Sequence, residues 1–157
     1  MNTYGDRLGN PMPENEEVKL NFHYIEIVIE AGKIKEFARA IGLENPIYFK
    51  KEAALQQGFE NIPVPPTFAT VIDFWNDQDF YQLFGFLNLQ PENVLHGEQS
   101  YEYVGNIYAG DRISAEVTVK EISHKKGKVF YYLETIYKNQ RSETVMLNQA
   151  TLIEVGM

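Results

Sequence analysis

Residues 112–120 read RISAEVTVK, and the pattern of this stretch decides the fold class. Its apolar side chains, Ile113, Ala115, Val117 and Val119, alternate strictly with polar ones. A period of two residues predicts a strand with one buried and one solvent-facing side. We therefore expect a sheet whose core lies on one face only.

Several segments around this one are also predicted to be strands. Residues 129–137 and 143–155 follow it, an earlier strand carries Tyr101 and Tyr103, and Phe22 to Ile29 is β-rich. The later strands are roughly ten residues long and are joined by short turns, a pattern typical of an antiparallel meander. The sequence thus predicts one first strand near the N-terminus and four long strands after residue 97.

Helical spacing appears between the first strand and the others. Residues 34–41 carry one apolar stripe that ends at Gly42, and residues 51–57 predict a short helix that ends at Gly58. A third helix should start at Pro65 or Pro66, where a missing N–H costs nothing. Its expected buried positions are Phe68, Ala69, Val71, Ile72, Phe74 and Trp75.

These elements predict an α+β hotdog fold, in which one curved antiparallel β-sheet wraps around a central buried α-helix. An open α+β sandwich would share the pattern. We expect a polar N-terminal arm over residues 1–20, which is poor in apolar side chains, and a single domain over residues 21–157.

Composition excludes several classes of protein. The net charge of -8 argues against general nucleic-acid binding, and the absence of cysteine excludes disulfides and thiolate metal sites. No apolar run is long enough for a transmembrane helix, and the N-terminus lacks a signal-peptide layout. A cytoplasmic protein is expected. An anionic ligand would need a basic patch, and either Lys50-Lys51 or Lys125-Lys126 with Lys128 could supply it, unless these lysines only form solvated turns.

Four stretches together resemble the MaoC-like dehydratase family. Residues 38–48 are similar to its Gly-Asp-x-Asn-Pro-x-His segment, and residues 64–68 to the start of its central helix. The stretch from Leu95 to Gln99, with Tyr101, Tyr103 and Gly110-Asp111, resembles the N-terminal, FAS1-like dehydratase branch, as do residues 138–141. The resemblance covers about residues 22–155.

The resemblance implies a hotdog dimer that binds (3R)-hydroxyacyl or trans-2-enoyl thioesters of coenzyme A or acyl carrier protein. It implies reversible addition of water with no cofactor and no metal. In active members the Asp and His of the motif activate the water. Here these positions are Leu43 and Tyr48. Leucine accepts no proton, and tyrosine has an ordinary pKa near about 10, so little hydratase activity is expected at this site.

Five residues are candidates for substrate binding. Asn45 could hydrogen-bond a thioester or water, or only set the turn before Pro46. Tyr48 could line an acyl pocket or belong to the core. Free N–H groups of Thr67 and Phe68 could bind a thioester oxygen, or simply open the helix. His96 could replace the missing base or be structural. Glu98 and Glu102 lie on the same strand face as a possible carboxylate pair.

The catalytic residues therefore stay unassigned, and four functions remain open. The chain could be an acyl-binding subunit whose partner carries Asp and His, or a self-sufficient lyase that uses His96 or Tyr48. It could be a hotdog acyl-CoA thioesterase in which Asp73, in the central helix, activates water. It could also be an acyl-thioester binding module without turnover.

Overall fold

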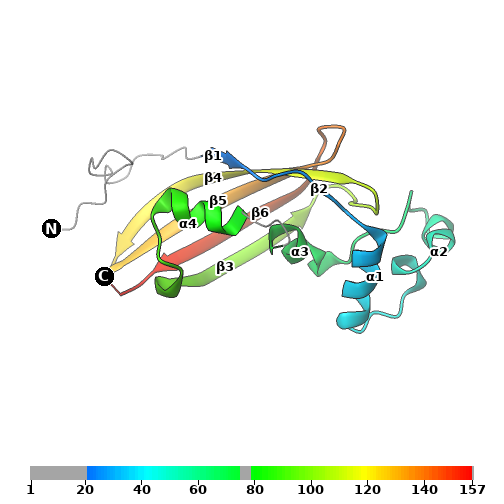
Figure 1. Cartoon of the computed structure of the whole chain (residues 1–157), viewed down its shortest axis with the longest axis horizontal. Helices are drawn as coiled ribbons and strands as arrows, with labels where there is room; N and C mark the ends of the chain where they lie inside the picture. The colour runs from blue at the N-terminus through cyan, green and yellow to red at the C-terminus, as the bar shows by residue number, and fades with distance from the viewer. Residues whose placement is uncertain (1–20, 75–78, 157) are drawn as a thin grey trace.

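The computed structural model describes residues 21–74 and 79–156. The arm expected over residues 1–20 and Trp75 of the expected central helix lie outside these residues. Figure 1 shows a long, curved sheet with helices on one face and a group of short helices at one end.

The sheet is antiparallel, with the order β1-β4-β5-β6-β3. Its long strands are β3 (Val94–Tyr103), β4 (Arg112–Lys125), β5 (Lys128–Lys138) and β6 (Thr144–Glu154). In β4 the predicted alternation is confirmed, because Ile113, Ala115, Val117 and Val119 are buried. The expected hotdog architecture is therefore present.

The first strand differs from the single strand predicted over Phe22 to Ile29. It is divided into β1 (Asn21–His23) and β2 (Ile27–Val28), and both pair with β4. From His23 to Ile27 the chain advances four residues, whereas the partner strand runs from Glu116 to Ile113, three residues. The extra residue on one side interrupts the ladder, as in a β-bulge.

The predicted helices before the central segment are confirmed. They are α1 (Ala31–Ala40) and α2 (Lys51–Gln56), with the 3-10 turn η1 (Pro46–Tyr48) between them. Gly42, at φ 74°, follows α1 in the left-handed region, where glycine carries no steric penalty. These short helices form the group at one end of the sheet (Figure 1).

The central segment starts as predicted, with η2 (Pro66–Phe68) followed by α3 (Ala69–Phe74). Phe68, Ala69 and Ile72 are buried against the sheet, but Phe74 is 56% exposed, so its expected place in the core is wrong. A further helix, α4 (Asp79–Leu87), covers the other half of the same sheet face (Figure 1). The last 3-10 turn, η3 (Pro91–Asn93), leads into β3.

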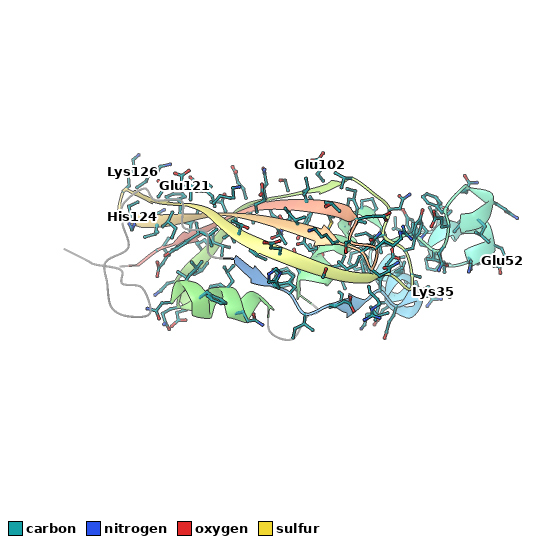
Figure 2. The ribbon with its side chains drawn as sticks, turned by 90° about the horizontal axis from the view of Figure 1, so that it is seen from above. Lys35, Glu52, Glu102, Glu121, His124 and Lys126 are labelled. Atoms are coloured by element: carbon teal, nitrogen blue, oxygen red, sulfur yellow. The ribbon has the colours of Figure 1, made fainter. Side chains whose placement is uncertain are left out.

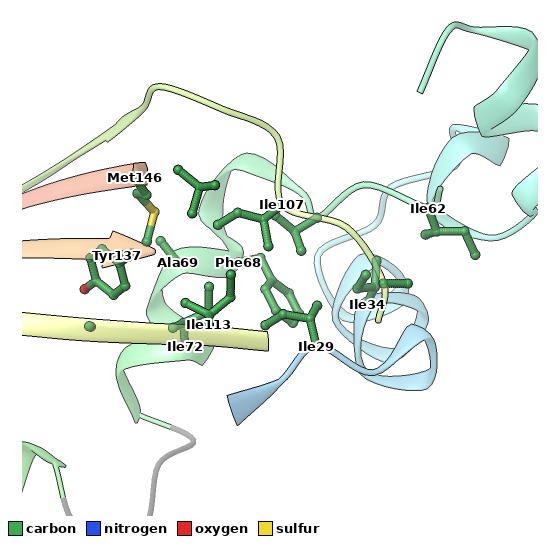
Figure 3. Close-up of a cluster of buried hydrophobic side chains, with 14 residues drawn as sticks. Ile29, Ile34, Ile62, Phe68, Ala69, Ile72, Ile107, Ile113, Tyr137 and Met146 are labelled. Carbon is green, nitrogen blue, oxygen red and sulfur yellow. The ribbon is translucent and has the colours of Figure 1, made fainter. Parts of the chain in front are cut away.

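The core consists of two apolar clusters along the concave face. One joins α1, η2 and α3 to the ends of β4, β5 and β6, and Figure 3 shows Phe68 at its centre, near Ile29 and Ile107. The other joins α4 to the opposite half of the sheet through residues such as Leu83, Val119 and Leu152. None of the helices in the described ranges is long and apolar enough to cross a membrane.

Candidate functional site

Asp73 is the buried carboxyl of the central helix. It lies in α3 between Ile72 and Phe74, and it is only 7% exposed. The apolar stripe of α3 faces the sheet, so this side chain points at the concave face rather than at solvent. A carboxyl in such a position needs hydrogen-bond donors to offset its lost hydration.

The donors come from two strands of the sheet. The Tyr101 hydroxyl, in β3, donates to Asp73 Oδ2 at 2.5 Å, and Gln99 Nε2 of the same strand lies 3.4 Å from that oxygen. The Tyr137 hydroxyl, in β5, donates to Oδ1. Gln99 Nε2 also donates to the Tyr101 hydroxyl. One carboxyl thus ties the central helix to the edge and the middle of the sheet.

The strand register explains why these groups meet. Asn148 in β6 lies directly opposite Thr135 on one side and Tyr101 on the other. Thr135 and Asn148 are both buried, and Asn148 Nδ2 lies 3.5 Å from the Tyr137 hydroxyl. Side chains opposite one another point to the same face of a sheet. We call these residues the Asp73 layer: Asp73, Gln99, Tyr101, Thr135, Tyr137 and Asn148.

The Asp73 layer lies between the two apolar clusters. In β5, Tyr137 belongs to the first cluster and Leu133 belongs to the second, with Thr135 between them on the same face. Tyr24 packs against both clusters. The concave face is therefore apolar, then polar, then apolar along its length. A plain hotdog core needs no such polar layer, and buried titratable groups concentrate at functional sites.

Burial dominates the electrostatics of the layer. It raises the pKa of Asp73 from 3.8 to about 6, although the hydrogen bonds from Tyr101 and Tyr137 lower that pKa in part. Burial, and then the nearby Asp73 charge, raise the pKa of Tyr101 and of Tyr137, so both remain protonated donors. Asp73 can therefore gain or lose a proton near neutral pH, as an acid–base group must.

Two buried polar atoms beside this carboxyl are not satisfied. Asn148 Oδ1 has no hydrogen-bond partner among the described residues, and neither has the Tyr103 hydroxyl. The latter lies near the Ala69 backbone but forms no bond of ordinary geometry there. Asp73 itself already receives three donors, so about one of the roughly four acceptor sites of its carboxylate is left for water or a substrate. Within residues 21–74 and 79–156 no group of three or more His, Asp or Glu side chains could hold a metal ion.

The segment that resembles the family's catalytic motif lies at the α1 end of the sheet (Figure 1). Leu43 is half-buried, and its N–H donates to the Ala38 carbonyl at 2.8 Å. Asn45 is exposed, and its Oδ1 accepts from Ile47 N at 3.2 Å, which is the turn-setting role. Tyr48 is half-buried against the first apolar cluster.

The start of the central helix offers fewer free donors than expected. Phe68 N donates to the Pro65 carbonyl at 2.9 Å, and its ring packs edge-to-face on Phe37 with centroids 5.4 Å apart. Thr67 is exposed, and its carbonyl accepts from the Thr70 hydroxyl at 2.9 Å. A thioester oxygen could use the Phe68 amide only if this turn opened. The Thr67 amide is the better of the two candidates.

His96 lies at the other end of the sheet. It is exposed near the start of β3, opposite Leu152 of the second apolar cluster. That end of β3 lies beside α4, whereas η1 and η2 lie toward the opposite end (Figure 1). The structure therefore does not bring His96 together with Asn45, Tyr48 or Thr67. A substrate role for each of these residues stays a prediction.

Sequence reasoning singled out Asp73 but not the rest of its layer. The period of two in β3 places Gln99, Tyr101 and Tyr103 on one face, and this signal was available. Tyr137 and Asn148 join them only through strand pairing between segments far apart in the chain. No local pattern in one sequence supplies that pairing.

Comparison with known proteins places the chain in a family. A family profile described as "FAS1-like, dehydratase domain region" matches residues 18–148. A UPF0336 protein of Saccharopolyspora erythraea is 32% identical over 124 residues, 79% of each chain. A UPF0336 protein of Streptomyces avermitilis is 37% identical over 95 residues, 60% of this chain and 63% of that protein.

Solved structures share the fold at low identity. C-terminally truncated HadBC, a 3R-hydroxyacyl-ACP dehydratase complex from Mycobacterium tuberculosis, gives a TM-score of 0.73 at 21% identity, over 90% of this chain and 99% of that one. A MaoC-like dehydratase from Rhodospirillum rubrum gives 0.71 at 20% identity, over 89% and 93%.

The curled antiparallel sheet and its central helix define a protein of the hotdog class, the fold that it shares with the solved MaoC-like dehydratases. Within that class, the chain belongs to the family of the FAS1-like dehydratase domain region.

Proposed function

We propose that this chain is the acyl-binding subunit of a (3R)-hydroxyacyl-thioester dehydratase, also acting as an enoyl-thioester hydratase, whose second hotdog subunit supplies the catalytic Asp and His. One observation carries the proposal: Leu43 and Tyr48 stand where the resemblance places these two groups. An aliphatic side chain accepts no proton, and a phenol is a poor base at neutral pH. The remaining family pattern is kept.

A pocket at the start of the central helix supports acyl binding. It has a volume of about 230 Å³ and is lined mainly by apolar residues of β2 and the central segment. They are Ile27, Val28, Ile29, Phe68 and Val71, together with the charged Glu30 and Lys33. Apolar walls with a few polar groups are typical of ligand sites. The thioester would belong to coenzyme A or to acyl carrier protein.

A partner subunit is supported by the comparison with HadBC, which is a complex. In such an arrangement this chain would shape the acyl site while its partner performs the proton transfers. Substrate positioning and chemistry would then come from different chains. The net charge of -8 means that an anionic thioester would need basic groups, from this chain or from the partner.

The test combines binding with turnover. Calorimetry with crotonyl-CoA should give binding to the chain alone, and Val71→Trp, which fills the pocket, should weaken it at least tenfold. Leu55→Trp on the exposed side of α2 is the matched control and should leave binding unchanged. Enoyl hydration should require co-expression with a MaoC-type subunit. If Val71→Trp binds crotonyl-CoA as tightly as the wild type does, this pocket is not the acyl site.

Thioester hydrolysis by Asp73 is a second candidate, favoured by its pKa of about 6. The Asp73 carboxylate would accept a proton from water while the water oxygen forms a bond to the thioester carbonyl carbon. The carbon–sulfur bond would then break, and the leaving thiolate would take the proton back from Asp73. Thiol release from acyl-CoA that disappears in Asp73→Asn would support this reaction. If the wild type releases no thiol, hydrolysis by Asp73 is excluded.

A further inference from the structure

The turn between β4 and β5 concentrates positive charge at one end of the molecule. Lys125, Lys126 and Lys128 are all exposed, and we call these three residues the basic tip. Figure 2 shows Lys126 at the end of the molecule opposite Glu52. No carboxylate in the described part of the chain forms an ion pair with any of the three lysines. The chain as a whole carries a net charge of -8, so the basic tip is a local exception.

Lys126 occupies a backbone position that suits a different residue. Lys125 pairs with Lys128, so Lys126 and Gly127 form a two-residue turn, with φ angles of 52° and 70°. Hairpin turns with two positive φ angles favour Asn-Gly or Asp-Gly, because most other side chains are strained in the left-handed region. A lysine there costs some stability and adds a charge at the apex of the turn. This combination favours a role for the charge that lies outside the fold.

An apolar row crosses the convex face of the sheet directly behind the basic tip. Strand pairing places Phe130 opposite Ile153, and Ile153 opposite Leu95. In β5 the residues on either side of Phe130 are buried in the second apolar cluster, so Phe130 itself faces outward. Phe130 and Ile153 are half-buried, and Leu95 is 52% exposed. None of the three belongs to either apolar cluster of the core, and we call them the outer row.

Lys125 joins the positive charge to the outer row. Its Nζ lies 5.7 Å from the centroid of the Phe130 ring and 5.8 Å from that of the Tyr132 ring. The same atom lies 3.5 Å from the Tyr132 hydroxyl. The side chain therefore folds back over aromatic surface while its charged end stays exposed. Side chains that are apolar along the stem and charged at the end suit the boundary between lipid tails and headgroups.

The basic tip is too far from the pocket beside Phe68 to bind the nucleotide end of a thioester held there. Ile27 of that pocket pairs with Ile113 in β4. From Ile113 to Lys125 the strand runs for about 40 Å, at about 3.3 Å per residue. This exceeds the length of extended coenzyme A. The basic tip is therefore separate from the acyl site of the proposed function.

The surroundings of the basic tip favour a lipid surface over a nucleic acid. The Phe130 ring is covered by Lys125, so it offers no free face on which a base could stack. Lysine is also a point charge, without the fork of arginine that matches phosphate in directed contacts. Farther along the convex face, Glu98 lies in one row with Tyr132 and Glu121. These carboxylates would repel an anionic surface laid flat on the sheet, so contact is confined to the basic tip and the outer row.

We propose that the basic tip and the outer row bind the surface of an anionic phospholipid bilayer. The lysines contact lipid phosphates, and Leu95 and Phe130 enter the headgroup region. Each lysine near such a surface strengthens binding roughly fivefold. The net charge of -8 opposes the approach over a longer range, so binding is weak, reversible and dependent on salt. This inference does not depend on the proposed function.

Co-sedimentation of the full chain with vesicles tests the proposal. The chain should bind vesicles of equal parts phosphatidylcholine and phosphatidylglycerol at least about tenfold more tightly than vesicles of phosphatidylcholine alone. The difference should fade at high salt. The triple variant Lys125→Gln, Lys126→Asn, Lys128→Gln should bind both kinds of vesicle equally. Leu95→Ser should weaken binding to the anionic vesicles without changing its salt dependence.

The single variant Lys126→Asn separates lipid binding from the stability of the turn. It should weaken binding to the anionic vesicles roughly fivefold, because one charge is lost. It should also raise the melting temperature, because asparagine suits this turn better than lysine does. A lysine with a purely structural role would not move these two readouts in opposite directions.

The matched control removes three positive charges at the other end of the molecule, through Lys35→Gln in α1 and Lys50→Gln with Lys51→Gln at the start of α2. Its binding to the anionic vesicles should stay within about twofold of the wild type. Three results would overturn the proposal: equal binding of the wild type to both kinds of vesicle, an equal loss in the control, or binding of soluble heparin as tight as that of the anionic vesicles. Crotonyl-CoA binding is measured separately, and the triple variant should leave it unchanged.

Discussion

Burial of the ionised Asp73 carboxylate costs free energy, and the hydrogen bonds from Tyr101 and Tyr137 offset only part of that cost. Its folded pKa of about 6 lies above the ordinary 3.8, so the folded protein binds this proton more tightly than the unfolded chain does. The resulting stabilisation is complete below about pH 4 and is lost as the pH rises through about 6. A shift of this size corresponds to about 3 kcal/mol.

The first prediction concerns Asp73→Asn. Between about pH 4 and pH 7 the wild type should lose on the order of 3 kcal/mol of unfolding free energy relative to this variant, because the amide does not ionise. Urea unfolding across that range measures the difference. Glu52→Gln, which removes an exposed carboxylate, should run parallel to the wild type. Parallel curves for Asp73→Asn as well would show that its pKa is ordinary.

The second prediction concerns the donor from β5. Tyr137 is fully buried, and Tyr137→Phe leaves Asp73 Oδ1 without that hydrogen bond. An unsatisfied buried acceptor costs about 1–3 kcal/mol, so urea unfolding near pH 7 should show a loss of that size. Tyr132→Phe, on the outer face of the same strand, should change stability by less than about 0.5 kcal/mol. An equal loss of stability in Tyr137→Phe and Tyr132→Phe would show that the hydrogen bond from the Tyr137 hydroxyl to Asp73 contributes nothing particular to stability.

At the scale of elements, periodicity predicted most of the fold. The alternation around Val117 fixed a strand and its buried face, and Ile34 with Ala38 fixed the inner face of α1. The sequence predicted one first strand where the structure has two, β1 and β2. The interruption between them depends on their register against β4, which no local pattern reveals. Phe74 was predicted to be buried but is exposed. An apolar stripe on a helix does not show where the sheet stops covering that helix. Asp73 was visible in the sequence, but its partners depend on strand pairing.

The irregularity in β3 gives the third prediction. A Cβ added at Gly97 would lie 2.9 Å from Ile153 Cδ1 and 3.2 Å from the Thr151 carbonyl oxygen. The Ile153 Cδ1 atom can rotate away but the Thr151 carbonyl cannot, so Gly97→Ala should destabilise the protein by about 1 kcal/mol. Gly32→Ala in α1, where nothing lies within 4 Å, should instead stabilise it by about 0.4–1 kcal/mol. Thermal or urea unfolding of both variants compares them, and a neutral Gly97→Ala would mean that Ile153 moves aside freely.

At the scale of the whole molecule, the sheet carries two apolar clusters with a polar layer between them. The segment beside α1 that resembles the family motif carries Leu43 and Tyr48 at the positions of the acid–base pair. The pocket beside Phe68 and the absence of an acid–base pair at Leu43 and Tyr48 support the proposal of an acyl-binding subunit whose partner would supply the catalytic groups.

The most direct measurement is the hydration of crotonyl-CoA by the isolated chain, followed by the loss of enoyl-thioester absorbance. We expect no rate above that of buffer, and no change when His23, His96 and His124 are all replaced by alanine. Turnover on the order of 1 s⁻¹ or faster, a rate typical of enzymes, that persists in the triple variant would contradict the account.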